Sequence, residues 1–255
     1  MDRLQMPKRL PVKLNREPLV EATCQLRVTN QVVLNTIFPG YLLAKHPDDV
    51  SELQSLPAAM LPEPMRMINP ELAYTPRVRL KFKGVLVMIG ERSVAVTNQA
   101  PYLGWPRFKA LIEEVFNDLL SSKLISGIER LSIKYLNVLK AKEEPSPQKA
   151  LAWNPGVGGL ELDIRTTHMR TEIRNGSLVT IVQLTGGVTV QVPNRAAEEG
   201  ALIDIDTVMP MEQQEAGKFA NSLSNELDRV RRVNKEVFFE CLTDEAVQAL
   251  GPTYE

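Results

Sequence analysis

Basic and apolar residues alternate through positions 77–83, Arg-Val-Arg-Leu-Lys-Phe-Lys. Because successive side chains on a β-strand point to opposite faces, the four basic side chains would share one face. Cations at strand spacing can follow the phosphates of a nucleic acid, but no aromatic residue lies on that face to stack bases. Basic residues also keep an exposed sheet edge from unwanted pairing, and we favour this structural interpretation. The four residues are Arg77, Arg79, Lys81 and Lys83.

A second basic group lies in residues 229–235, Arg-Val-Arg-Arg-Val-Asn-Lys, within a long predicted helix. Arg229, Arg231 and Arg232 could assist the strand residues in binding nucleic acid or an acidic partner. Residues 1–142 hold 20 Lys and Arg against 13 Asp and Glu, whereas residues 143–255 hold 10 against 18. This asymmetry points to an acidic partner for the first half, although we favour mutual neutralisation of the two halves. The pI of about 6.2 is far below the value of about 9 that is typical of nucleic-acid-binding domains.

Asp204 and Asp206, in Leu-Ile-Asp-Ile-Asp-Thr, share one face of a predicted strand. Paired carboxylates can hold Mg²⁺ or divide into a general acid and a general base. Exposed strand faces are routinely charged, so we favour cross-strand ion pairs instead. The expected partners are Arg165, Arg170 and Arg174.

Histidine and cysteine are scarce, and the chain holds only His46, His168, Cys24 and Cys241. They do not have the local spacing of zinc ligands. The glycines of residues 154–163 precede a strand rather than open a helix, unlike a phosphate-binding loop, and no nucleophile elbow is present. The sequence therefore predicts no metal, no cofactor and no catalytic residue, which favours a non-enzymatic protein.

The composition is that of an ordinary globular protein, with 44% hydrophobic and 24% charged residues. No apolar run approaches the roughly 20 residues of a membrane-spanning helix. The first sixteen residues are basic and lack the apolar stretch of a secretory signal. The sequence therefore predicts a cytoplasmic protein with reduced cysteines and no membrane partner.

The first half, residues 1–142, predicts a strand–helix–strand–strand–helix–strand order. Alternation predicts strands at 18–28, 77–84, 85–98 and 128–140, and apolar spacing predicts helices at 41–56 and 105–122. This βαββαβ order is that of a ferredoxin-like module, in which two helices cover one side of a sheet. Prolines interrupt residues 57–76, which we interpret as an ordered loop or flap. Its methionines, Met60, Met65 and Met67, could form an adaptable contact surface, but we favour them as fillers of gaps over the core.

Residues 143–159 have the charge, proline and glycine content of a linker, so the second half, residues 143–255, is predicted to be a separate subdomain packed on the first. Strands within 160–210 are separated by Asn175-Gly176, a strong hairpin signal, and by Gly186-Gly187, which together predict an antiparallel meander. A long helix follows from Pro210 to about Phe239, and Thr243 caps a last short helix. The chain is thus predicted to belong to the α+β class.

Four short motifs occur in order along the chain: Arg-Glu-Pro-Leu-Val-Glu-Ala at 16–22, Tyr-Leu-Gly-Trp-Pro-Arg-Phe at 102–108, Ile-Lys-Tyr-Leu-Asn at 133–137, and Phe-x₃-Thr-Asp-Glu at 239–245. Together they resemble a sporadically distributed bacterial family of uncharacterised proteins of similar length. Lys134 stands where family members usually have arginine, and Arg232 stands where many have histidine. The family-like positions are Pro18, Glu21, Trp105, Tyr135, Asn137, Phe239 and Thr243.

The resemblance implies no reaction, cofactor or substrate. A patchy distribution is typical of genes on mobile elements, such as defence or toxin-control modules. The leading hypothesis is therefore a non-enzymatic interaction or regulatory protein that binds or neutralises the product of a nearby gene. The alternative is a nucleic-acid-binding protein that uses the basic strand and the basic helix patch. A homo-oligomer is compatible with either hypothesis.

Overall fold

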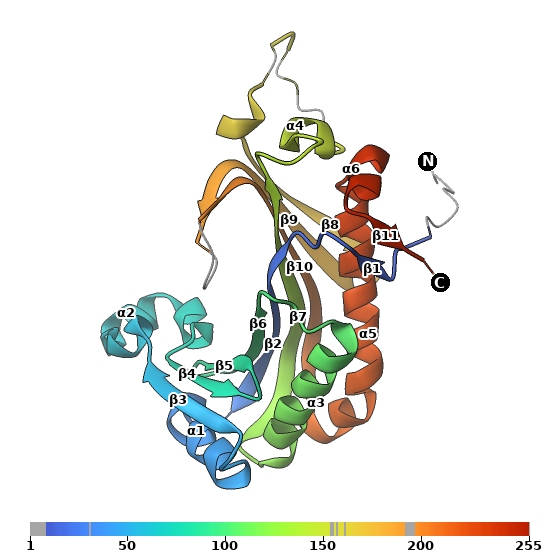
Figure 1. Ribbon diagram of the computed structural model, residues 1–255. Coiled ribbons are helices and arrows are strands. Elements are labelled where there is room, and N and C mark those ends of the chain that lie inside the picture. Colours follow the sequence, from blue (N-terminus) through green and yellow to red (C-terminus); the bar gives the residue numbers. More distant parts are fainter. Residues whose placement is uncertain are drawn as a thin grey trace.

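The computed structural model describes residues 9–30, 32–153, 156, 158–160, 162–191 and 197–254. Its main element is a nine-stranded antiparallel sheet with the strand order β3-β4-β5-β6-β2-β7-β10-β9-β8 (Figure 1). The strands are β2 (Leu19–Asn30), β3 (Val50–Ser55), β4 (Val78–Phe82), β5 (Val85–Ile89), β6 (Ser93–Gln99), β7 (Ile125–Lys140), β8 (His168–Asn175), β9 (Leu178–Val190) and β10 (Glu198–Glu215).

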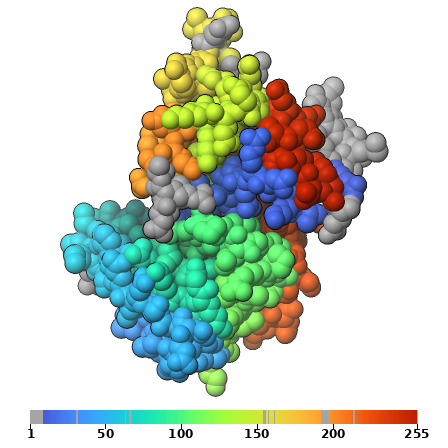
Figure 2. Space-filling view, viewed as in Figure 1, coloured from blue at the N-terminus to red at the C-terminus, as the bar shows by residue number. Residues whose placement is uncertain are grey.

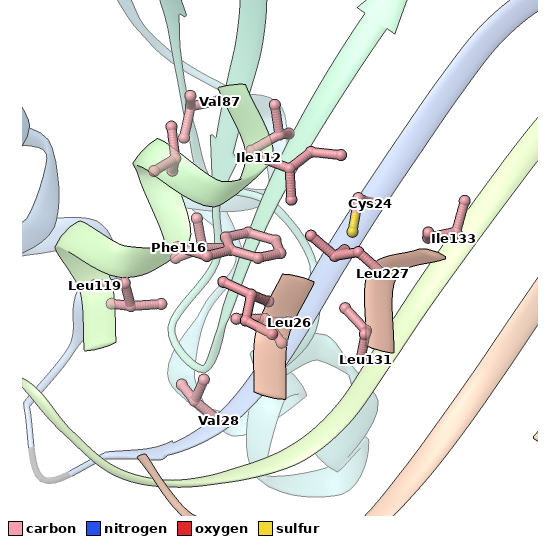
Figure 3. Close-up of a cluster of buried hydrophobic side chains, with 14 of the residues drawn as sticks. Cys24, Leu26, Val28, Val87, Ile112, Phe116, Leu119, Leu131, Ile133 and Leu227 are labelled. Carbon is pink, nitrogen blue, oxygen red and sulfur yellow. The ribbon is translucent and has the colours of Figure 1, made fainter. Parts of the chain in front are cut away.

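Three helices cover one face of this sheet: α1 (Leu34–Lys45), α3 (Trp105–Ser121) and α5 (Ala216–Glu240). Helices α3 and α5 lie side by side, and α1 packs near the end of the sheet that holds β3 to β5 (Figure 1). The alternation in β2 turns Cys24, Leu26 and Val28 toward these helices, where all three are fully buried. They meet Phe116 of α3 and Leu227 of α5 in the main core (Figure 3).

Short elements complete the fold. Between β3 and β4 lie η1 (Pro57–Met60), α2 (Glu63–Ile68) and η2 (Pro70–Tyr74). In the second half lie α4 (Pro147–Ala150), η3 (Ile164–Thr166) and α6 (Asp244–Ala249), and β1 (Lys13–Leu14) pairs with β11 (Pro252–Thr253) near the two ends of the chain. No helix among the described residues is both long and apolar enough to cross a membrane.

The α+β class is confirmed, but two elements of the first half were predicted wrongly. The helix expected at 41–56 is wrong, because α1 ends at Lys45 and residues 50–55 form the edge strand β3. The single strand expected at 85–98 is two strands, β5 and β6, joined by a tight turn. Gly90 is needed in that turn, because a Cβ there would meet the backbone oxygen of Thr75 at 2.9 Å.

Residues 77–83 were expected to form a sheet edge, and this expectation is wrong. β4 lies between β3 and β5 and forms ladder pairs with both. The edge is β3, whose ladder with β4 is broken between Ser51 and Gln54, and Glu52 there has a φ of 52°. A bulge of this kind keeps an edge strand from pairing with another chain, so it supplies the protection that we had assigned to the basic residues.

The meander of the second half is confirmed for β8, β9 and β10, and the Asn175-Gly176 hairpin joins β8 to β9. The long helix is also confirmed, although β10 continues past Pro210 to Glu215 before α5 begins. Gly186 and Gly187 lie inside β9 instead of separating two strands. The backbone of η3 crosses β9 at this point, and a Cβ on Gly186 would meet the carbonyl oxygen of Ile164 at 1.7 Å.

The two halves share one sheet, because β10 pairs antiparallel with β7 from Gly127 to Lys140. A buried amide on α5 strengthens this junction. Asn234 donates hydrogen bonds to the carbonyl oxygens of Ile133 in β7 (3.0 Å) and Ile205 in β10 (2.9 Å). Part of the expected linker, residues 154, 155 and 157, lies outside the described residues; Pro147–Ala150 of that segment form α4.

Candidate functional site

The four basic residues of the β4 segment are all engaged with residues of this chain. Arg77 is only 5% exposed, and its Nη1 lies 2.5 Å from Oε1 of Glu91. Arg79 donates to the side-chain oxygen of Gln54, and Lys81 pairs with Glu52 at 2.6 Å, so both side chains reach across to β3. These contacts use part of the donor capacity of the side chains, and the remaining Nε and Nη2 of Arg77 are buried away from solvent.

Lys83 does not continue the face that Arg79 and Lys81 share. It has a φ of 48° in the Lys83-Gly84 turn between β4 and β5. This turn directs its ammonium group to Glu114 of α3 (2.6 Å) and to Asp49 (3.3 Å). The expected single row of four cations is thus reduced to two, and both are paired.

The three arginines of α5 lie in three different environments. Arg229 contacts Ser177 (2.6 Å) and Glu226 (3.2 Å), beside the hairpin of β8 and β9. The side chain of Arg232 is 71% exposed, with Glu236 3.9 Å away. Arg231 turns toward α3, where its guanidinium carbon lies 5.2 Å from the centre of the Trp105 ring. Helix α5 packs on the central strands β7 and β10. Strands β5, β6 and β2 lie between these strands and β4, so the arginines of α5 and the basic residues of β4 do not form one surface.

The carboxylates of β10 form cross-strand pairs, but with β7 rather than with the expected arginines. Asp204 pairs with Lys134 and Asp206 pairs with Arg130, each at 2.8 Å. Burial raises the pKa of Asp206 above its ordinary value, against the opposing effect of Arg130. Among the described residues, no group of three or more His, Cys, Asp or Glu side chains has the geometry of a metal site.

The expected arginine partners of Asp204 and Asp206 have other contacts. Arg165 pairs with Asp163 at 2.7 Å, and Arg170 pairs with Glu172 at 2.9 Å. Both contacts join residues only two positions apart, whereas β9 separates β8 from β10. The prediction of these arginines as partners was therefore wrong.

His46 joins an ion-pair cluster that the sequence did not reveal. Its Nε2 lies 2.6 Å from Asp118 of α3, and Lys45 also contacts this carboxylate. Because Asp118 is buried, the cluster ties the end of α1 to α3. His168 is exposed, and its Nδ1 lies 2.8 Å from the hydroxyl oxygen of Thr185.

The two cysteine thiols are poorly suited to nucleophilic chemistry. Cys24 is fully buried in the main core. Burial also raises the pKa of Cys241 to about 11, so its thiolate is rare at neutral pH. Neither residue therefore offers an activated sulfur.

Four large apolar side chains lie exposed on β3, η1 and α2, and we call them the flap surface. The exposed fractions are 63% for Leu53, 85% for Met60, 55% for Met65 and 84% for Ile68. The interpretation of Met60 and Met65 as fillers of gaps over the core is therefore wrong, and the side chain of Met67 lies outside the described part of the chain. In Figure 2 the segment that carries the flap surface forms the left margin of the molecule.

The flap, residues 56–76, is held on the sheet at its C-terminal end. The ring of Tyr74 lies between two guanidinium groups, 4.2 Å from Arg27 and 5.5 Å from Arg92. Its hydroxyl donates to Glu129 at 2.7 Å. Arg27 also pairs with Glu71 at 2.8 Å, so several polar contacts position this end of the flap.

The family-like positions fall in several places. Pro18, Tyr135, Asn137 and Phe239 line one small cavity beside α5, and Trp105 contacts Arg231, which also lines it. Glu21 lies 3.4 Å from Gln99, and Thr243 caps α6 by accepting from the N–H of Ala246. Among known proteins, neither a family model nor a curated sequence matches this chain, so membership of the bacterial family stays a prediction.

Proposed function

We propose that the protein is a non-enzymatic interaction protein and that a partner protein binds the flap surface. The observation that supports this proposal most strongly is the exposure of Met60 and Ile68, which are 85% and 84% open to solvent. Single exposed apolar residues are common, whereas an apolar patch marks an interaction site in soluble proteins. Met65 and Ile68 are three residues apart on α2 and so lie on one face of it. Binding would remove this apolar area from water and stabilise the complex.

The charge of the segment specifies the partner. Residues 53–62, Leu-Gln-Ser-Leu-Pro-Ala-Ala-Met-Leu-Pro, contain no charged side chain, and α2 adds one charge of each sign, Glu63 and Arg66. A charged segment of a partner protein would lose its hydration on binding there without gaining an ion pair. Flexible methionines adapt to the apolar faces of helices. The partner segment we propose is therefore an amphipathic helix that presents its apolar face.

The anchored end of the flap favours binding. Tyr74 and Glu71 already hold it against the sheet, so complex formation orders less of the chain. In keeping with the sequence-based expectation, we propose that the partner is encoded nearby and that the pair acts in the cytoplasm. A regulatory or neutralising role in a mobile defence or toxin-control module remains part of this proposal.

Replacing the exposed apolar residues should abolish partner binding. We expect the product of an adjacent gene to co-purify with the chain, and the combined variant Met60→Ser, Met65→Ser, Ile68→Ser to lose at least about 10-fold in affinity, since hot-spot truncations typically cost more than 1 kcal/mol each. Co-expression with each neighbouring gene product, followed by calorimetry on the purified pair, measures this.

The matched control is Leu160→Ser with Ile173→Ser, which removes exposed apolar residues outside the flap. It should bind as the unaltered chain does. A chain that stays alone with every neighbouring gene product would contradict the proposal, as would a flap variant that binds normally. If the chain alone forms a dimer that the flap variant cannot form, the partner is a second copy of this chain.

Nucleic-acid binding is the weaker proposal, because Arg79 and Lys81 already engage Gln54 and Glu52. We expect Arg79→Glu with Lys81→Glu to leave any affinity for duplex DNA or single-stranded RNA unchanged. Fluorescence anisotropy at several salt concentrations tests this. Binding that weakens steeply with salt and disappears in the variant would instead support the nucleic-acid function.

We also infer that the first half contains a ferredoxin-like module with an insertion. The neighbouring strands β5-β6-β2-β7, with α1 after β2 and α3 after β6, have the order of such a module. In this interpretation β3, the flap and β4 are inserted before β5. The insertion would thus carry the flap surface to the far edge of the sheet.

A further inference from the structure

A small cavity lies between the N-terminal segment, β7 and α5, on the helix-covered side of the sheet. Figure 1 shows that two of the elements that line it, β1 and α5, pass beside each other. About 80 Å³ of it is open to the centres of water-sized molecules, which is enough for several waters or a small organic molecule. Its apolar walls come from Pro18, Leu19, Tyr102, Tyr135, Phe238 and Phe239.

Two cations of α5 project into this apolar setting. Arg231 and Lys235 both line the cavity and are four residues apart, so they lie on the same face of the helix. Like charges at this spacing repel each other. Burial and the neighbouring Arg231 lower the pKa of Lys235 to about 8, as expected for an ammonium group removed from water without a counter-ion.

The carboxylate of Asp228 attracts Arg231 electrostatically but forms no ion pair with it within the described residues. Asp228, one turn before Arg231, binds the Trp105 indole N–H at 2.8 Å and Lys109 at 2.5 Å. Glu17 lines the cavity, but burial raises its pKa and its nearest favourable charge is Lys13. Neither Arg231 nor Lys235 has an ion pair with any residue that the structure describes.

Arg231 also retains an unused donor. Its Nε is buried and has no hydrogen-bond partner among the described residues. The Trp105 ring covers one side of the guanidinium, and Asn137 and the Tyr102–Tyr135 pair, whose hydroxyl oxygens are 3.2 Å apart, supply further polar groups at the cavity wall. The side chain of Arg231 is half-buried and also interacts with the hydroxyl of Tyr135. A buried donor such as its Nε costs stability until it gains a hydrogen-bond partner.

We propose that this cavity binds a small organic monocarboxylate, with the carboxylate held by Arg231 and Lys235 and an apolar group held by Tyr102, Tyr135 and Phe238. A guanidinium fork and an adjacent ammonium group match a carboxylate well. The apolar walls favour an aromatic or short aliphatic carboxylate over a phosphate, and Glu17 in the lining disfavours a doubly charged anion more than a singly charged one. This site is independent of the flap surface.

The test uses the full chain with benzoate, phenylacetate and butyrate as probes, and with benzyl alcohol and inorganic phosphate for comparison. Calorimetry reports binding, and so does tryptophan fluorescence in a Trp153→Phe background, where Trp105 is the remaining tryptophan. At least one carboxylate should bind, and both the neutral and the phosphate probe should bind at least about 10-fold more weakly. Failure of all three carboxylates at 10 mM, a concentration of about the order at which fragment-sized ligands bind, would overturn the proposal, as would equal binding of benzyl alcohol or phosphate.

Variants locate the site. Arg231→Gln should weaken carboxylate binding at least about 10-fold, because it removes one partner of a buried charge pair, while Arg231→Lys should retain part of the affinity. Arg232→Gln, at the neighbouring exposed arginine, should bind as the unaltered chain does. Circular dichroism checks that each variant is folded. Undiminished binding by folded Arg231→Gln would show that the carboxylate binds elsewhere and would overturn the assignment.

The pH dependence gives an independent measure. Affinity should fall between about pH 7.5 and 9.5 as Lys235 loses its proton, since Arg231 stays charged and the carboxylate stays ionised. The other titratable groups that line the site are Tyr102, Tyr135, Glu17 and Lys13. Burial raises the pKa values of Tyr102 and Tyr135, so these hydroxyls do not ionise in this range. Lys235→Arg should remove the decline. The same decline in this variant would overturn the role of Lys235.

Discussion

Asn234→Ala is expected to lower the free energy of unfolding by about 3 kcal/mol. Asn234 is completely buried, and its amide nitrogen donates to carbonyl oxygens of both β7 and β10. The substitution removes two buried hydrogen bonds, which contribute about 1 kcal/mol each, and leaves two carbonyl groups poorly satisfied in a small cavity. Urea unfolding monitored by circular dichroism measures the change.

Asn225→Ala is the matched control on the same helix, because Asn225 is exposed. It should change the free energy of unfolding by less than about 0.5 kcal/mol. A loss of under 1 kcal/mol in Asn234→Ala would show that the amide does not hold α5 to the sheet. The position also bears on the proposed carboxylate site, since Arg231 and Lys235 lie close to Asn234 on α5.

The elements that were predicted correctly have a local signal. The alternation of Ala22, Cys24, Leu26 and Val28 marks β2 because only one of its faces packs on helices. The Asn175-Gly176 pair marks its hairpin because glycine readily adopts a positive φ, here 59°. Thr243 marks the start of α6 because its hydroxyl can accept from a free backbone N–H.

The missed features depend on tertiary contacts. Strand β3 has no alternation, because all its residues after Val50 are exposed at the edge of the sheet. The sequence shows Arg79 and Lys81 as free cations, whereas Gln54 and Glu52 of the unrecognised β3 engage them. Charge patterning alone therefore overstated the binding capacity of the strand.

The cavity beside α5 could not be predicted from spacing either. Its lining comes from residues 11–19, Tyr102, residues 135–137 and the end of α5, which only the folded chain brings together. The sequence analysis grouped Arg231 with Arg229 and Arg232, but in the structure these two arginines lie in different environments. The signal that could have separated them is helical geometry: Arg231 and Lys235 share a face with the buried Phe238, four and seven residues along the helix.

Lys235→Met is expected to raise the free energy of unfolding at pH 7 by about 1 kcal/mol. The pKa of Lys235 falls from 10.5 to about 8 in the folded protein, chiefly through burial. A shift of that size corresponds to about 3 kcal/mol, which we reduce because the side chain is partly open to solvent. Methionine fills a similar volume without a charge that must be buried.

The sign of the pH dependence follows from this lowered pKa. Below about pH 8 both states bind the proton, so the destabilisation is complete. Between about pH 8 and 10.5 the unfolded chain keeps a proton that the folded protein has lost, so stability rises with pH. The gain from Lys235→Met should therefore be largest at pH 7 and vanish near pH 10.5.

Urea unfolding of the unaltered chain and of Lys235→Met at pH 7, 9 and 10 tests this expectation. The difference between their free energies of unfolding removes the effect of the other groups that titrate in both proteins. Lys218→Met, at an exposed position on the same helix, should change little at any of these pH values. A loss of stability in Lys235→Met at pH 7 would mean that the ammonium group is satisfied within the chain. A gain would mean that the fold retains a destabilising charge, which is expected of a residue kept for binding rather than for stability.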